Sequence, residues 1–305
     1  MMKNRILIIT SSFDRTCDYI MARYKDIAFF RLNTDNFSNY RISYDLSGFR
    51  IKDSSGDEVN SANCKSIYYR KPASEDLTGV IDAQYQAFSH KEGHSLIEGI
   101  VESFSGRCLS KPSVMRRADN KILQAYLAQR VGFIIPDLVI TNDNLAISAL
   151  EEHKAIVKPL SIGSVSYDNK KEYVQTNEYN LNINNDSLKY SPAYFQKYIS
   201  KDYEVRATFV CEQVFSVKIE SENKIDWRKK NNNVSYEIFE LPEDIYNKCL
   251  KFMSENNINF GCFDFIINQG TWYFLEMNAN GQWAWLEFET GMIISKAIVD
   301  YLNDE

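Results

Sequence analysis

The chain opens with short apolar runs separated by polar connectors. Arg5–Thr10 predicts a strand, Thr16–Tyr24 a helix, and Ile27–Leu32 a second strand. Tyr40–Leu46 and Phe49–Lys52 flank a Ser-Gly pair and predict a hairpin. The order strand, helix, strand predicts an α/β lobe at the N-terminus.

Apolar residues in the middle of the chain recur at helical spacing. The predicted helices cover Asp82–Phe104, Asn120–Arg130 and a stretch near Leu145–Glu152, and the last of these lies between strands at Asp137–Thr141 and Ala155–Pro159. A connector that contains Pro112 is expected between the first two helices.

The last third reads as hairpins and helices. A strand is predicted at Ala193–Ile199, hairpins at Glu204–Val210 with Gln213–Ile219 and at Gly261–Ile267 with Trp272–Met277, and helices at Pro242–Asn256 and Met292–Leu302. The whole pattern predicts an α/β lobe followed by two α+β lobes.

Composition narrows the function classes. The 305 residues carry a net charge of -6, which argues against a dedicated nucleic-acid binder. The 6 cysteines form no CxxC pair, and His90 and His94, although they could share a helix face, have no third ligand nearby, so a zinc site is not expected. No run is long enough to span a membrane, and we expect a cytoplasmic protein with reduced thiols.

The strongest chemical signal lies in the last predicted hairpin. Asp264 is on one strand, and Glu276 and Asn278 end the next. Because side chains alternate along a strand, Glu276 and Asn278 share a face, and the hairpin partner can bring Asp264 beside them. Two carboxylates and an amide oxygen suit Mg²⁺ that also holds phosphate oxygens.

Two lysines occupy positions suited to phosphate binding. Lys158 ends an apolar strand and precedes the small-residue loop Ser161–Ser164, whose N–H groups could support a phosphate. Lys121 stands at the start of a helix, where the dipole also favours an anion. A solvated lysine is the alternative for each.

The segment Phe195–Ile199 runs from a strand into a connector that could supply backbone groups to a base. Glu204 could accept hydrogen bonds from ribose hydroxyls. Arg206, on the same strand face, could point at phosphates or form an ion pair with Glu204.

These residues resemble a known superfamily. The order Lys121, Lys158-Pro159, Gln196–Ile199, Glu204–Arg206, Asp264 and Glu276–Asn278 resembles the ATP-grasp superfamily, from about Lys111 to the C-terminus. A narrower resemblance, to the ATP-grasp peptide maturases that make graspetides (microviridin-like ω-ester or ω-amide cross-linked peptides), rests on Tyr68–Pro72, Phe195–Ile199, Asp226–Arg228, Glu276–Trp283 and Glu287.

The resemblance implies an ATP-grasp fold with an N-terminal pre-ATP-grasp lobe over residues 1–112, a central lid lobe over 113–192 and a C-terminal lobe over 193–305. It also implies ATP and two Mg²⁺ ions as cofactors. The implied roles are phosphate contacts for Lys121 and Lys158, adenine contacts for Gln196, Lys197, Tyr198 and Ile199, a ribose contact for Glu204, metal ligation by Asp264, Glu276 and Asn278, and catalysis by Arg228, Lys158 and Arg206.

The implied function is an ATP-dependent carboxylate ligase. It would activate Asp or Glu side chains of a ribosomal precursor peptide as acyl phosphates and join them to Ser, Thr or Lys side chains of the same peptide. The expected partner is a precursor peptide with a leader segment, and a homodimer stays open. The alternatives are an ATP-grasp ligase that extends a free amino acid or a protein C-terminus, and a non-catalytic nucleotide-binding regulator; the intact Asp264, Glu276, Asn278 and Arg228 argue against the regulator.

Overall fold

The structure is a computed structural model that describes residues 4–150, 154–161, 163–167, 170–173, 176–180, 186–223 and 232–304. It divides into two compact units. Unit 1 comprises the residues up to Met115, the short segment Ile258–Phe260 and the residues from Gln282 onward; unit 2 comprises Arg116–Asn257 and Gly261–Gly281. The three-lobe boundaries expected from the sequence stay a prediction.

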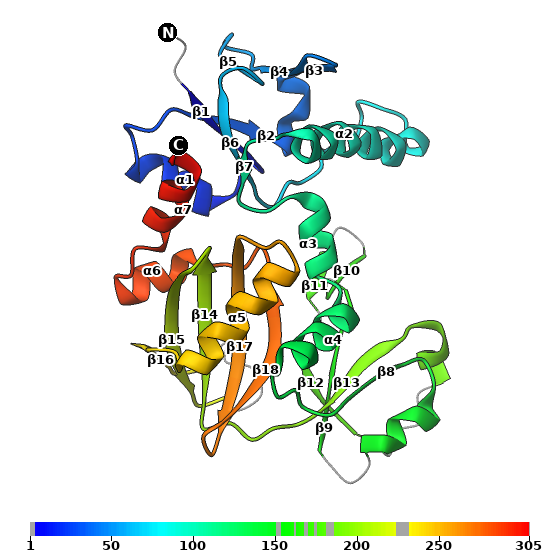
Figure 1. Cartoon of the computed structure of the whole chain (residues 1–305). Helices are drawn as coiled ribbons and strands as arrows, with labels where there is room; N and C mark the ends of the chain where they lie inside the picture. Colours follow the sequence, from blue (N-terminus) through cyan, green and yellow to red (C-terminus); the bar gives the residue numbers. More distant parts are fainter. Residues whose placement is uncertain are drawn as a thin grey trace. The chain divides into compact units, whose positions relative to one another are not determined.

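Unit 1 is built on a parallel sheet (Figure 1). Its order is β2 (Phe29–Asn33), β1 (Arg5–Thr10), β6 (Cys64–Tyr69) and β7 (Arg107–Cys108). The central strand β1 is buried from Ile6 to Thr10, as expected for a strand that is covered on both faces. The predicted N-terminal α/β lobe is therefore confirmed.

The remaining elements of unit 1 surround this sheet. They are α1 (Arg15–Arg23), η1 (Thr34–Asn39), the antiparallel strands β3 (Arg41–Asp45), β4 (Gly48–Lys52) and β5 (Glu58–Asn60), α2 (Ala83–Ser103), α6 (Ala284–Thr290) and α7 (Ile294–Asn303). The helix α3 (Pro112–Ala118) runs across the boundary between the units. The sequence reading missed α6 and treated α3 as a connector, because neither seven-residue helix is long enough to show a helical period.

Unit 2 contains a five-stranded antiparallel sheet in the order β16 (Val234–Ile238), β15 (Gln213–Ser221), β14 (Tyr203–Val210), β17 (Phe260–Asn268) and β18 (Thr271–Asn278). The helix α5 (Glu243–Glu255) lies over one face of this sheet (Figure 1). Phe252 of α5 packs on Phe263 and Phe274, with ring centroids 5.6 and 5.8 Å apart. One face of the sheet is therefore an aromatic core, and the other face is left for polar side chains.

A second sheet of unit 2 has the order β12 (Asn177–Tyr179), β9 (Ala155–Lys158), β13 (Ala193–Lys197) and β8 (Leu138–Thr141). The short elements near it are η2 (Asn144–Leu150), the hairpin β10 (Ser164–Tyr167) and β11 (Lys170–Tyr173), and η3 (Asp186–Tyr190). The helix predicted near Leu145–Glu152 is a 3₁₀ helix, and residues 151–153 lie outside the described part.

The helix α4 (Lys121–Val131) completes unit 2. Asn120 caps its start by accepting from the Leu123 N–H, and Gly132 ends it with a left-handed φ of 92°. Both ends lie within one residue of the prediction, because the capping residues can be recognised in the sequence.

Candidate active site

The predicted acidic group is assembled on the hairpin of β17 and β18. Asp264 and Glu276 are direct cross-strand partners. The side-chain amide of Asn278 donates to both, at 3.3 Å to Asp264 Oδ2 and 3.3 Å to Glu276 Oε1. The structure thus brings together all three residues that the sequence singled out as metal ligands.

A β-bulge makes this arrangement possible. Asp264 pairs with Glu276, but the next residue, Phe265, pairs with Phe274, so Leu275 is the extra residue of β18. Without the bulge, Phe274 and Glu276 would share one face, because they are two positions apart. With it, Phe274 joins the aromatic core while Glu276 stays on the polar face.

Arg206 on β14 is tied to the acidic group. Its Nη1 donates to both oxygens of Asp264, at 2.8 and 2.9 Å, and the residue is buried. Gly281 lies against it, since a Cβ there would come within 2.9 Å of Arg206 Nη2 and 2.6 Å of Cys262 Sγ. The close approach explains the glycine in the Glu276–Trp283 segment.

Lys121 and Gln124 attach α4 to the same strand. Lys121 Nζ lies 3.4 Å from Glu276 Oε2. One turn further along the helix, the amide of Gln124 accepts from the Met277 N–H at 2.9 Å and donates to the Met277 carbonyl at 2.8 Å. Because β18 is an edge strand, Gln124 takes the place of a strand neighbour and fixes Lys121 relative to Glu276.

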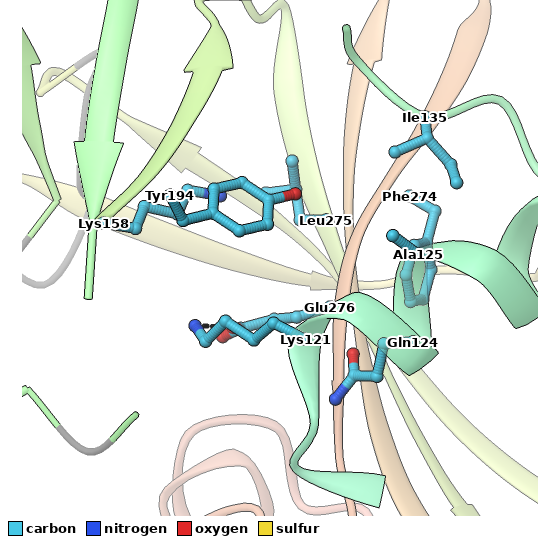
Figure 2. A pocket seen from close by; sticks show the side chains of 9 residues that line it. All are labelled: Lys121, Gln124, Ala125, Ile135, Lys158, Tyr194, Phe274, Leu275 and Glu276. Carbon is cyan, nitrogen blue, oxygen red and sulfur yellow. Dashed lines mark hydrogen bonds and ion pairs between the residues drawn. The ribbon is translucent and has the colours of Figure 1, made fainter. Parts of the chain in front are cut away.

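Lys158 and Tyr194 line a cleft together with Lys121 and Glu276 (Figure 2). The apolar wall of the cleft consists of Ala125, Ile135, Phe274 and Leu275. Two cationic side chains and one carboxylate beside an apolar wall match the polarity of a nucleotide.

The predicted adenine-binding segment is partly engaged within the chain. The Lys197 N–H donates to the Asp137 carbonyl at 2.8 Å, and the Tyr198 N–H donates to the Lys154 carbonyl at 2.7 Å. Ile199 is half-buried. A base at this segment would therefore have to use backbone groups other than these two N–H groups.

Glu204 pairs with Lys201 at 2.5 Å, and both side chains are largely buried. The sequence reading left open an ion pair between Glu204 and Arg206. Arg206 is instead bound to Asp264, although alternation on β14 puts Glu204 and Arg206 on one face. Arg228, with Asp226 and Trp227, lies outside the described residues.

The acidic group fits a hard cation. The negative charge of Glu276 is one cause, after loss of solvation, of a raised pKa at both Asp119 and Tyr194. A cation would offset this local excess of negative charge. Within the described ranges no three His, Cys, Asp or Glu side chains form a metal cluster, so the donors here would be two carboxylates and the Asn278 amide oxygen, a set that Mg²⁺ accepts.

The other motif residues form internal contacts of unit 1. The side chain of Arg70 is fully buried and donates to Asp14 at 3.0 Å and to Gln282 Oε1 at 2.6 Å. Trp283 Nε1 lies 3.4 Å from Tyr68 Oη, and both residues are buried. The boundary between the two units falls between Gly281 and Gln282. The Glu276–Trp283 segment therefore begins in unit 2 and ends in unit 1.

Comparison with known proteins shows which proteins this chain resembles. Residues 5–116 match the model of the MvdD pre-ATP grasp domain. The chain is similar to a Chryseobacterium gregarium RiPP-associated ATP-grasp ligase solved with ADP and a leader and core peptide, with 28% identity, a TM-score of 0.88, and 99% of this chain and 97% of that chain covered. The chain shares the fold of ATP-grasp ligases and is similar to them over nearly its whole length. No curated protein gave a significant match.

Two further ATP-grasp structures are similar over their whole length. The macrocyclase MdnC from Microcystis aeruginosa, solved with the precursor peptide MdnA, has 25% identity, a TM-score of 0.87, and 99% of this chain and 100% of that chain covered. The macrocyclase MdnB from the same organism has 27% identity, a TM-score of 0.82 and the same coverage. None of the helices in the described ranges could span a membrane.

Sequence reasoning missed two polar residues that line the cleft, Gln124 and Tyr194. Gln124 lies one helical turn after Lys121, and Tyr194 lies two residues before Gln196 on the same strand face. Each could have been found by asking which residues share a helix or strand face with Lys121 or Gln196. Neither residue type is diagnostic by itself.

Proposed function

We propose that this ATP-grasp ligase uses ATP and Mg²⁺ to activate side-chain carboxylates of a ribosomally made precursor peptide. The activated carboxylate would then form an ester or amide cross-link within the same peptide. The observation that carries the proposal is the cleft in which Lys121 contacts Glu276, beside Asp264 and Asn278, with Lys158 on its wall. The solved relatives with ADP and peptides support the choice of substrate.

The charges of the cleft suit a triphosphate. Lys121 and Lys158 would contact phosphate oxygens as point charges. Asp264, Glu276 and Asn278 would hold Mg²⁺, and we propose two ions because the two carboxylates together offer four oxygens. When bound, the metal supplies neutralisation of the charge on the transferring phosphoryl group. Arg206 would keep Asp264 oriented through its two hydrogen bonds.

The reaction would proceed in two displacements. A carboxylate oxygen of the peptide attacks the γ-phosphorus, the bond to the β-phosphate oxygen breaks, and ADP leaves an acyl phosphate on the peptide. A hydroxyl or amine of the same peptide then attacks the acyl carbon, loses its proton, and expels inorganic phosphate. Arg228 would stabilise the oxyanion of this second step. No described side chain is assigned as the base that takes the proton.

Nucleotide contacts outside the cleft stay proposals. Glu204, held by Lys201, would accept from ribose hydroxyls. The backbone of Gln196, together with Lys197, Tyr198 and Ile199, would border the adenine. The N–H groups of Lys197 and Tyr198 are already bonded to carbonyl groups of the chain. A leader segment on the peptide, a homodimer and a cytoplasmic location also stay predictions.

The test uses the purified chain with ATP, Mg²⁺ and the short acidic, Ser/Thr/Lys-containing peptide encoded next to its gene. We expect ADP release that depends on the peptide, and loss of one water per cross-link in the peptide mass. Trimming the N-terminal half of the peptide should reduce the rate if a leader is recognised. Turnover of free amino acids with no change in any peptide would favour the amino-acid ligase, and absence of ATP binding would overturn the proposal.

A further inference from the structure

The side chain of Gln196 is fixed at both ends. Lys158 Nζ lies 2.7 Å from Gln196 Oε1, and Gln196 Nε2 lies 3.2 Å from Tyr194 Oη. An ammonium group can only donate, so the amide atom that it contacts must be the oxygen. The amide nitrogen therefore faces Tyr194 and donates to the hydroxyl oxygen. Gln196 itself is 1% exposed and cannot turn to another partner without breaking both bonds.

This arrangement fixes the role of the Tyr194 hydroxyl. Its oxygen accepts from Gln196, so its own proton must be donated elsewhere. Within the described part of the chain, this hydroxyl donates no hydrogen bond to another residue. Burial and the negative charge of Glu276 raise the pKa of Tyr194, so the hydroxyl keeps its proton at neutral pH. Tyr194 thus brings an O–H donor to the cleft.

The position of the donor points to its ligand. Tyr194 borders the same cleft as Lys121, Lys158 and Glu276, and Figure 2 shows these four side chains around one space. The Lys158 ammonium lies 5.5 Å from the centre of the Tyr194 ring. A group that rests beside two ammonium ions and accepts from a hydroxyl is an oxyanion.

We propose that Tyr194 is a further nucleotide-binding residue, whose hydroxyl donates to a phosphate oxygen held by Lys121 and Lys158, and that Gln196 is the residue that positions both Tyr194 and Lys158. The inference rests on the proposed function, because it takes the cleft to hold ATP. It also assigns the Gln196 side chain to the phosphate end of the site rather than to the adenine.

Tyr194→Phe removes the hydroxyl and keeps the ring beside Lys158. Calorimetric titration should give a loss of ATP affinity of about tenfold, the size expected for one hydrogen bond to a charged group. The affinity for adenosine, which has no phosphate, should not change. Tyr190→Phe, at an exposed tyrosine of η3, is the matched control and should leave both affinities unchanged. Thermal unfolding of each variant checks that the fold is intact.

A double-mutant cycle with Gln196→Glu separates donation from packing. A carboxylate still accepts from Lys158, but it has no N–H, so Tyr194 must donate to it and has no proton left for phosphate. In this background Tyr194→Phe should no longer reduce ATP affinity. Gln196→Glu and the double variant both carry the added negative charge, so its effect on ATP affinity cancels when the two are compared.

The outcomes distinguish the two proposals. An equal loss of ATP and adenosine affinity, no loss at all, or the same loss in both backgrounds would overturn the role of Tyr194 while ATP binding by the unaltered chain stands. If the unaltered chain binds no ATP, the proposed function itself fails.

Discussion

The side-chain amide of Gln124 pairs with both backbone groups of Met277, as a neighbouring strand would. The two hydrogen bonds measure 2.9 and 2.8 Å, and the same amide nitrogen donates to the Ala118 carbonyl at 2.5 Å. Met277 lies between Glu276 and Asn278, so one side chain of α4 fixes the backbone of the acidic group. The backbone groups of the edge strand are therefore hydrogen-bonded at the position next to Glu276 and Asn278, where a rigid backbone keeps the site residues in place.

Gln124→Leu should therefore damage both stability and nucleotide binding. The variant leaves the Met277 N–H and carbonyl buried without partners, which should cost about 2 kcal/mol or more. Lys121 loses its fixed distance to Glu276, so KM for ATP should rise. Chemical denaturation and steady-state kinetics measure the two effects. Gln129→Leu, an exposed position of the same helix, is the matched control; equal behaviour of the two variants would contradict the role of Gln124.

Glu276→Gln should abolish turnover while the fold survives. The amide keeps the volume of the carboxylate but loses its charge, and with it the attraction for Lys121 and for a cation. We expect kcat to fall about a hundredfold or more at ordinary Mg²⁺, with partial recovery at high Mg²⁺ if an ion is held here. The exposed Glu240→Gln controls for the loss of one carboxylate. Near wild-type product formation by Glu276→Gln would remove Glu276 from the metal site.

Much of the fold follows from local patterns in the sequence. Strand β1 is an unbroken apolar run, and α4 begins at a capping Asn120 and ends at Gly132, so both could be placed within a residue. The hairpin of Asp264 and Glu276 was also predicted, because its turn residues and alternation are local. These features depend on neighbours in the chain.

The parts that were missed depend on contacts between distant residues. No local signal marks Leu275 as a bulge, yet that bulge separates Phe274 from Glu276 onto opposite faces. The sequence also carried no sign that Arg70, in the Tyr68–Pro72 motif, would be buried. Its complete burial results from the packing of segments more than 200 residues apart, since it contacts Gln282.

Arg228→Ala tests the catalytic role predicted from the Asp226–Arg228 motif. An arginine that stabilises developing negative charge acts in the transition state, so the cross-linking rate should fall by about a hundredfold or more while ATP affinity is nearly unchanged. Single-turnover mass spectrometry of the peptide gives the rate, and calorimetry gives the affinity. Lys229→Ala removes a neighbouring positive charge and is the control. Full cross-linking by Arg228→Ala would exclude the role.

The buried pair of Asp14 and Arg70 should make stability depend on pH. Asp14 accepts from Arg70 Nε at 3.0 Å, Thr10 Oγ1 at 2.9 Å and the Thr16 N–H at 3.0 Å. Burial acts to raise the pKa of Asp14, but the Arg70 charge and these hydrogen bonds together bring it below its usual value. A carboxylate with a lowered folded-state pKa stabilises the fold above the unfolded-state pKa, and this contribution is lost as pH falls through the folded-state pKa.

Asp14→Asn should isolate this contribution. At neutral pH the variant leaves Arg70 buried without its counter-charge, which should cost about 3 kcal/mol or more. As pH falls from about 6 to about 3, the wild type should lose stability faster than Asp14→Asn, so the difference in free energy of unfolding should shrink. Urea denaturation at each pH measures it, and Asp26→Asn controls for the loss of an exposed carboxylate. If the difference in free energy of unfolding stays constant across this range, the charge of Asp14 does not stabilise the fold. The variant would then be destabilised by altered packing.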